Sequence, residues 1–377
     1  MMRRSPLYNF YNGELNQVIT ILERLRIRSL RLVDVLTSVF IFLNVGLFIT
    51  INWHFISDDL DPTVMLIVIV MPIVISIQLW VIDWFLSKGF QSYIPSLILG
   101  MVFSVGFTGL IIFGPAFVGN NMIPLIVLLI VNLAISLKII WMYWFISRKF
   151  RETFKQYVVN EFISFIGQDL HYGPKKSIPR AKFSDSHLFQ PEISFYQGKD
   201  YIHGQLAGVN FEFSELAVTT SSISSKHSKR DYRSSTFNGF FFAIELTKPA
   251  TGITLIYPRF ADQPKSSKMY VRAKLEDPVF EQRFNVYTTD QVGARIQLTP
   301  TVMNKIMQFG KIQPHNIHLS FNENHLYVAI TGHTNYLEAS IWKSLLEQET
   351  IWIFLEKLSL ILSIPRDFSF VNAVEAN

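Results

Sequence analysis

The chain has 377 residues, a formal net charge of +5 and no cysteine, which excludes disulfide bonds, thiolate zinc sites and a cysteine nucleophile. Only 17% of its residues are charged, against roughly 25% in soluble globular domains. The basic excess lies beside hydrophobic segments, so the composition indicates no nucleic-acid partner.

The first 33 residues are expected to form a cytoplasmic amphipathic arm. Apolar residues recur at helical spacing, with arginines on another face, and they are Leu15, Val18, Leu22 and Leu25 against Arg24, Arg28 and Arg31. This pattern is typical of a helix at a bilayer surface, with its arginines toward anionic headgroups. A helix packed on a soluble domain is the alternative.

Residues 34–147 are expected to form a transmembrane region of four helices, because a span needs roughly 17 to 25 mostly apolar residues. The four stretches are residues 35–51, 64–85, 93–114 and 122–145. The flanks on one side hold eleven basic residues, which are Arg3, Arg4, Arg24, Arg26, Arg28, Arg31, Lys88, Arg148, Lys149, Arg151 and Lys155. The other two loops hold none, which predicts a multi-pass protein of the bacterial inner membrane with both termini in the cytoplasm.

The positions of the charged residues within these stretches predict helices that pack together, rather than helices that line a conduction path. Asp83 and Lys138 are placed near the cytoplasmic ends of their helices, where long side chains can reach the interface.

Residues 148–377 are expected to form a cytoplasmic α+β domain. After a continuing helix, strand-like runs alternate with turns, a short helix begins near Thr299, and a long helix over residues 340–364 closes the domain. Many strands followed by a terminal helix predict a curved, mostly antiparallel sheet.

Four segments of this domain carry a family resemblance. They are YIHGQLAGVNFEFSEL, FNGFFFAIEL, EDPVFEQRFNVYTTDQVGARIQLTPTVMNKI and IHLSFNENHLYVAI. Together they resemble the bacterial membrane-protein family catalogued as domain of unknown function 3137, over about residues 154–370. The resemblance implies a LemA-type membrane protein as a partner and no established activity.

The third of these segments is explained as scaffold. Asp277 before Pro278 and Asp290 in TTDQVGAR are expected to cap short helices, with Phe280, Phe284 and Val286 in the core. The alternative is a catalytic role for the carboxylates Glu276, Asp277, Glu281 or Asp290, but no partnered base, nucleophile or metal-ligand spacing accompanies them.

No nucleotide-binding, hydrolase or zinc-peptidase motif occurs, so no catalytic residue, metal or cofactor is assigned. Four histidines fall close together and are expected to be ordinary surface residues, namely His315, His318, His325 and His333.

The loop over residues 221–235 is the candidate binding surface. It carries four basic side chains among serines, which are Lys226, Lys229, Arg230 and Arg233. These could receive acidic lipid headgroups or a partner's phosphate, although most such loops are simply solvated.

The sequence therefore predicts an integral membrane protein that presents a cytoplasmic binding or scaffold module to the bilayer and to a protein partner, as part of an envelope-associated complex. It is more consistent with a non-enzymatic protein. The alternatives are a membrane-anchored enzyme with an unrecognised site and a regulated transport component.

Overall fold

The computed structural model describes residues 10–31, 123–189, 193–222, 233–259, 269–312, 317–332 and 335–368. The chain divides into two compact units, each considered by itself. Unit 1 comprises Met1–Val18, Phe154–Glu338 and Gln348–Asn377, and unit 2 comprises Ile19–Thr153 and Ala339–Glu347.

Unit 2 contains most of α5 (Ile123–Phe154). It also contains residues 19–31 of the N-terminal helix, whose description ends at residue 31. No helix among the described residues is both long and apolar enough to cross a membrane. The prediction of four spans, and with it the classification as a transmembrane protein, is therefore wrong on the residues that the structure describes. The expected fourth span is not a separate element, because its apolar run is the first part of α5, which continues through Arg148, Lys149, Arg151 and Glu152. The other three stretches lie outside the described residues.

Glu23 joins the N-terminal helix to the segment 339–347 within unit 2. Its carboxylate accepts hydrogen bonds from Arg26 at 2.7 and 2.8 Å, from the Ser344 hydroxyl at 2.7 Å and from the Leu345 amide at 3.0 Å. Arg26 also donates to the Ile341 carbonyl at 3.0 Å. Glu23 is buried, so this face of the helix packs on protein.

We predict an acid-sensitive contribution from Glu23. Burial raises its pKa, but the hydrogen bonds from Arg26, Leu345 and Ser344 outweigh burial and lower the pKa below its usual 4.5. A lowered folded pKa adds stability above the unfolded pKa, and that stability is lost as pH falls through the folded pKa. Glu23→Gln should therefore reduce stability at pH 7 more than at pH 3 in urea unfolding of the full chain. The exposed Glu356→Gln on the C-terminal helix is the control, and equal losses at both pH values would contradict the prediction.

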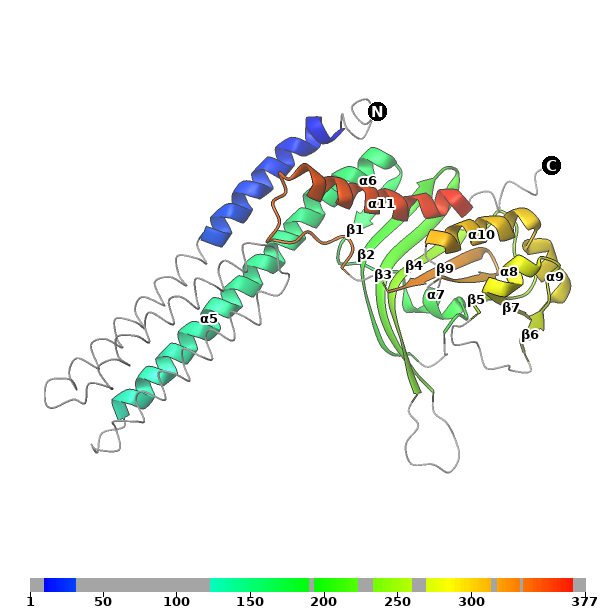
Figure 1. Cartoon of the computed structure of the whole chain (residues 1–377), viewed down its shortest axis with the longest axis horizontal. Coiled ribbons are helices and arrows are strands. Elements are labelled where there is room, and N and C mark those ends of the chain that lie inside the picture. The colour runs from blue at the N-terminus through cyan, green and yellow to red at the C-terminus, as the bar shows by residue number, and fades with distance from the viewer. Residues whose placement is uncertain are drawn as a thin grey trace, which may run out of the picture. The chain divides into compact units, whose positions relative to one another are not determined.

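Unit 1 is built on a nine-stranded sheet of order β1-β2-β3-β4-β9-β8-β5-β7-β6, in which every described pairing is antiparallel (Figure 1). The strands are β1 (Leu170–Gly173), β2 (Ile193–Leu206), β3 (Val209–Ser222), β4 (Arg233–Glu245), β5 (Thr254–Pro258), β6 (Val271–Ala273), β7 (Phe284–Thr288), β8 (Ile317–Asn322) and β9 (His325–Thr331). The helical elements are η2 (Tyr11–Leu15), η4 (Lys155–Val159), α6 (Asn160–Ile166), α7 (Arg180–Asp185), α8 (Pro278–Arg283), α9 (Gln291–Gln297), α10 (Pro300–Ile312) and α11 (Gln348–Phe368). The sheet and terminal helix thus agree with the expected α+β domain.

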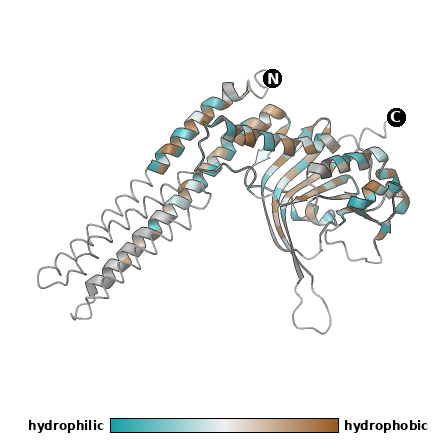
Figure 2. Cartoon of the chain, in the orientation of Figure 1, coloured by the Kyte–Doolittle hydropathy of each residue, from teal (hydrophilic) through white to brown (hydrophobic). Residues whose placement is uncertain are grey.

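Both faces of the central strands are buried, which explains the unbroken apolar run GFFFAI of β4. Successive side chains on a strand point to opposite faces. Phe241 packs against Phe183 of α7 on one face, at 5.0 Å between ring centroids. Phe240 and Phe242 pack with Phe213 on the other, at 5.5 and 4.8 Å. Hydrophobic residues accordingly run along these strands in Figure 2. All five phenylalanines named here are buried, with no more than 4% of any residue exposed.

The closing helix α11 begins at Gln348, later than the expected residue 340. The preceding segment, residues 339–347, folds as turns because side-chain oxygens accept hydrogen bonds from its backbone amides. Ser340 accepts from the Trp342 amide, Ser344 from the Leu346 amide and Glu23 from the Leu345 amide. Short polar side chains that bond the backbone in this way compete with helix formation.

The two expected helix caps are confirmed. Asp277 accepts from the amides of Val279 and Phe280 at 2.8 and 3.1 Å, and Asp290 accepts from the Val292 amide at 3.0 Å. The expected core residues Phe280, Phe284 and Val286 are each exposed by 2% or less.

Both caps predict a simple mutational response. Asn caps a helix about as well as Asp, so Asp277→Asn should be nearly neutral, whereas Asp277→Ala should cost about 0.5–2 kcal/mol of unfolding free energy. The measurement is urea unfolding of the full chain, with the adjacent exposed Glu276→Ala as a control. Equal destabilisation by Asn and Ala would show that the charge matters rather than the cap.

Candidate functional site

A β-bulge in β2 places a carboxylate inside unit 1. Lys199 pairs with Glu215 and Ile202 with Phe213, so β2 has one residue more than β3 between these pairs. Within the bulge, Asp200 has a left-handed backbone (φ +59°) and a fully buried side chain. The bulge therefore aims a charge into the protein interior.

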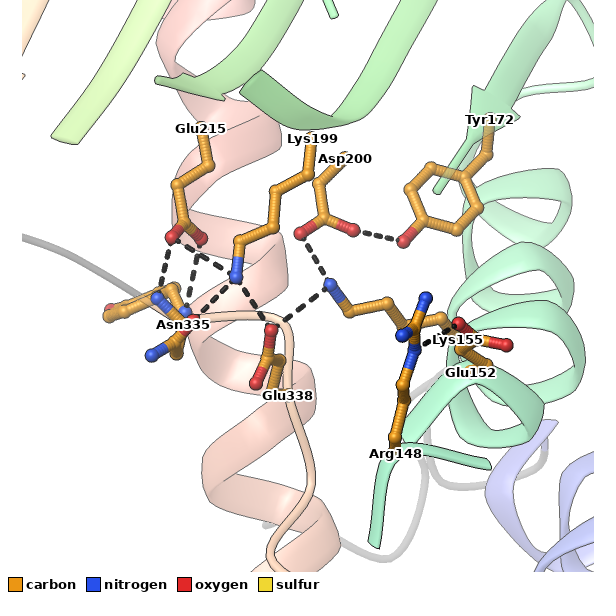
Figure 3. Close-up of polar contacts among 10 residues, drawn as sticks. Arg148, Glu152, Lys155, Tyr172, Lys199, Asp200, Glu215, Asn335 and Glu338 are labelled. Carbon is orange, nitrogen blue, oxygen red and sulfur yellow. Dashed lines mark hydrogen bonds and ion pairs between the residues drawn. The ribbon is translucent and has the colours of Figure 1, made fainter. Parts of the chain in front are cut away.

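Two groups from other elements bind this carboxylate (Figure 3). The Lys155 ammonium of η4 lies 2.7 Å from Asp200 Oδ2, and only 7% of the lysine side chain is exposed. The Tyr172 hydroxyl of β1 donates to Asp200 Oδ1. Burial, and then the negative charge of Asp200, raise the pKa of Tyr172 far above its usual 10, so the phenol stays protonated and acts as a donor.

The network continues to the segment after β9. The Lys199 ammonium donates to Glu338 at 2.6 Å, and Glu338 lies 3.5 Å from Lys155. Burial lowers the pKa of Lys199, but the hydrogen bond to Glu338 and the charges of Glu215, Glu338 and Asp200 outweigh it and raise the pKa. Lys199 is therefore charged at neutral pH and is no general base.

Glu215 closes the network from β3. Its carboxylate accepts from the Asn335 amide at 2.6 Å and from the Tyr336 amide at 3.3 Å, and it lies 3.5 Å from Lys199. Three carboxylates, two ammonium groups and one phenol thus bind one another and the backbone. Because every one of these groups contacts another member, the arrangement fixes chain segments and offers no free nucleophile.

Two members lie next to the points where the chain passes between the units. Lys155 is the second residue of the range that begins at Phe154, and Glu338 ends that range. The network therefore holds both ends of this range to β2 within unit 1.

A second polar cluster lines a cleft of about 250 Å³ on the same strands, where His203 and Glu212 lie three residues along β2 and β3 from Asp200 and Glu215. We call it the sheet-end cleft, and its lining residues are Lys182, His203, Gly204, Asn210, Phe211, Glu212, Ala243, Glu245 and His325. His203, Glu212 and Ala243 are register partners on neighbouring strands, and Glu245 pairs with His325. The small Ala243 lies in the row between larger polar residues and leaves room for the hollow.

Hydrogen bonds and ion pairs orient the polar groups of the sheet-end cleft. Lys182 of α7 binds Glu212, and Tyr201 donates to the same carboxylate. Burial, followed by the charge and hydrogen bond of Glu212, raises the pKa of Tyr201 to about 12. Asn210 donates to Glu245 at 2.8 Å.

Both histidines of the cleft favour the neutral form. Burial lowers the pKa of His203, and the nearby His171 lowers it further, against Glu212. Burial and then Lys182 lower the pKa of His325, against three nearby carboxylates, which are Glu245, Glu212 and Glu323. Neutral imidazoles can each donate and accept one hydrogen bond.

The candidate binding loop is not tested by the structure. Lys226, Lys229 and Arg230 lie outside the described residues, and Arg233 is the first residue of β4, where it pairs with Ser222. The alternative catalytic carboxylates have structural partners instead, since Asp277 and Asp290 cap helices and Glu281 accepts from the Leu275 amide at 2.7 Å.

The four histidines do not form one site. His318 is buried in β8 beside Tyr257 and Phe189, so the prediction of a surface position is wrong for it. His325 lines the sheet-end cleft, and His315 and His333 lie outside the described residues. Among the residues that the structure describes, no three His, Cys, Asp or Glu side chains are arranged to hold a metal ion.

The fold is that of an α+β domain, with an antiparallel sheet whose central strands are buried on both faces. Residues 235–369 match the family model described as "Protein of unknown function (DUF3137)", which confirms the resemblance for that part of the chain. No curated protein matches the chain. Among solved structures, the mycobacterial trehalose monomycolate transport factor A, TtfA, is similar at 10% identity and a TM-score of 0.28, over 52% of this chain and 88% of that one. A likeness at this TM-score supports no conclusion about this protein.

We predict strong coupling between Lys155 and Asp200. Lys155→Met leaves the carboxylate buried without its cation and should cost about 3–5 kcal/mol of unfolding free energy. In Asp200→Asn the new residue also tolerates the left-handed backbone, so the loss of unfolding free energy reports the effect of the charge. In the double variant the loss should be smaller than the sum of the single losses, as measured by urea unfolding of the full chain. Lys305→Met on α10 is the exposed-lysine control, and additive losses would contradict the pairing.

Proposed function

We propose that unit 1 is a non-enzymatic binding module whose recognition site is the sheet-end cleft. The observation that carries this proposal is the convergence of polar side chains from four strands and α7 on one hollow. A concave site with a few convergent polar groups is the usual place of ligand recognition.

The buried network has a different role in this proposal. Its charged groups are paired with one another, with one carboxylate in excess, and lie largely away from solvent, so it serves as the internal support of the module. Recognition sites bind more tightly when their side chains are held in place before the ligand arrives. The network and the cleft share strands β2 and β3, which makes the network a suitable support.

The family resemblance implies a LemA-type membrane protein as a partner, and we propose it as the first protein to test. An envelope-associated complex is the setting in which the module would then act.

The test is co-purification of the LemA-type protein with the full chain from producing cells. Asn210→Trp should block the sheet-end cleft with a bulky ring and reduce recovery of the partner at least fivefold, because Asn210 is an exposed lining residue. Gln197→Trp is the matched control, since Gln197 is also exposed and lies on β2 outside the cleft. Equal recovery with both variants would remove the cleft from the proposal, and no recovery with the unaltered chain would remove this partner.

A further inference from the structure

Two histidines face each other on the first two strands of the sheet. His171 of β1 is the register partner of His203 of β2, and their ring centroids are 5.3 Å apart at an interplanar angle of 46°. Residues directly opposite each other on antiparallel strands have their side chains on the same face of the sheet. The two imidazoles therefore form a cross-strand pair, which we call the histidine pair.

The glycine next to His203 holds β1 close to β2 beside this pair. Gly204 is the register partner of Leu170, and its φ of +142° lies in the region that favours glycine. A Cβ at this position would lie 2.1 Å from the Asp169 carbonyl oxygen, so only glycine permits this close approach. The register that brings His171 to His203 is thus specified by β2.

A neighbouring ring orients His203. The Tyr201 ring stacks on the His203 ring at 4.8 Å between centroids, and the Tyr201 hydroxyl donates to Glu212. Charges of both signs lie near His203, namely those of Glu212 and Lys176, so charge alone selects no ligand here. Selectivity at the histidine pair must therefore come from the ring nitrogens.

The separation of the two rings fits a tetrahedral metal ion. Zinc binds imidazole nitrogens at about 2.0–2.1 Å in tetrahedral geometry, which places each ring centroid about 3.2 Å from the ion and two such centroids about 5.2 Å apart. The 5.3 Å between the centroids of His171 and His203 matches this value. Imidazole is a suitable ligand for zinc, copper and nickel, whereas magnesium and calcium prefer oxygen ligands.

We propose that the histidine pair binds a divalent ion of the zinc class between the imidazoles of His171 and His203. His171 is exposed, so the site is open to solvent. Since no three His, Cys, Asp or Glu side chains converge on an ion in the described part of the chain, the remaining coordination positions belong to water or to a ligand from a partner. The site lies beside the sheet-end cleft, which His203 lines, but it does not depend on the proposed function.

The test is calorimetric titration of the purified, untagged full chain with zinc chloride. We expect saturable binding of zinc and no binding of magnesium. His171→Gln and His203→Gln should each weaken zinc binding about tenfold or more, because each removes one of two ligands and metal affinity falls on this scale even when supporting groups are lost. His187→Asn is the matched control, because His187 is an exposed histidine that contacts Tyr270 instead, and Asn tolerates its left-handed backbone (φ +53°).

Thermal unfolding supplies a second measurement. Zinc that binds the folded chain more tightly than the unfolded chain raises the unfolding temperature. This rise should be lost in both glutamine variants and retained in His187→Asn. Unfolding without zinc checks that each variant is folded.

Two outcomes would overturn the inference. Zinc binding that either glutamine variant retains in full would place the ion on other side chains, and equal binding of magnesium would exclude a site built on imidazole nitrogens. The Asn210→Trp co-purification decides the proposed function separately. Loss of the partner in that variant, together with no zinc binding by the unaltered chain, would support the function and remove the metal site.

Discussion

The ion pair between Lys155 and Asp200 is the interaction on which the rest of unit 1 depends. Two charges are withdrawn from water, at a cost of several kcal/mol per ion that only good geometry and further hydrogen bonds can offset. The 2.7 Å contact, the Tyr172 hydroxyl and the neighbouring Glu338 supply these. Since η4, β1 and β2 each contribute one partner, the pair specifies how three elements meet.

The sheet leaves little opportunity for a partner to add a strand. Near one edge, Arg180 donates to the Ile193 carbonyl of β2 at 2.8 Å, and at the other edge Gln291 donates to the Arg272 carbonyl of β6 at 3.3 Å. Side chains that occupy edge carbonyls, together with the three-residue length of β6, are typical means of preventing edge-to-edge association. Recognition at the end of the sheet, in the sheet-end cleft, agrees better with these protected edges.

Local signals in the sequence were sufficient for part of this structure. Asp277 before Pro278 and Asp290 before a small turn predict caps, because a cap needs only neighbours two or three residues away. The buried network was missed because Lys155 and Asp200 are 45 residues apart, and Lys155 and Glu338 are 183 apart. A lysine between Phe154 and Val158, on an otherwise apolar helix face, was the available signal. The membrane spans were inferred from apolar composition alone, which does not define where α5 begins and ends.

The bulge links the buried network to the sheet-end cleft through strand register. Asp200 and His203 are three residues apart on β2, yet Asp200 binds Lys155 and Tyr172, whereas His203 lies beside Glu212 in the cleft. In a strand, a shift of one residue moves every later side chain to the opposite face. The extra residue of the bulge sets the register from Ile202 onward, and the left-handed backbone of Asp200 is maintained by the ion pair that its side chain makes. Loss of that ion pair would therefore remove the interaction that stabilises the bulge. Without the bulge, His203 would turn away from Glu212. The cleft would then lose its arrangement of donors and acceptors.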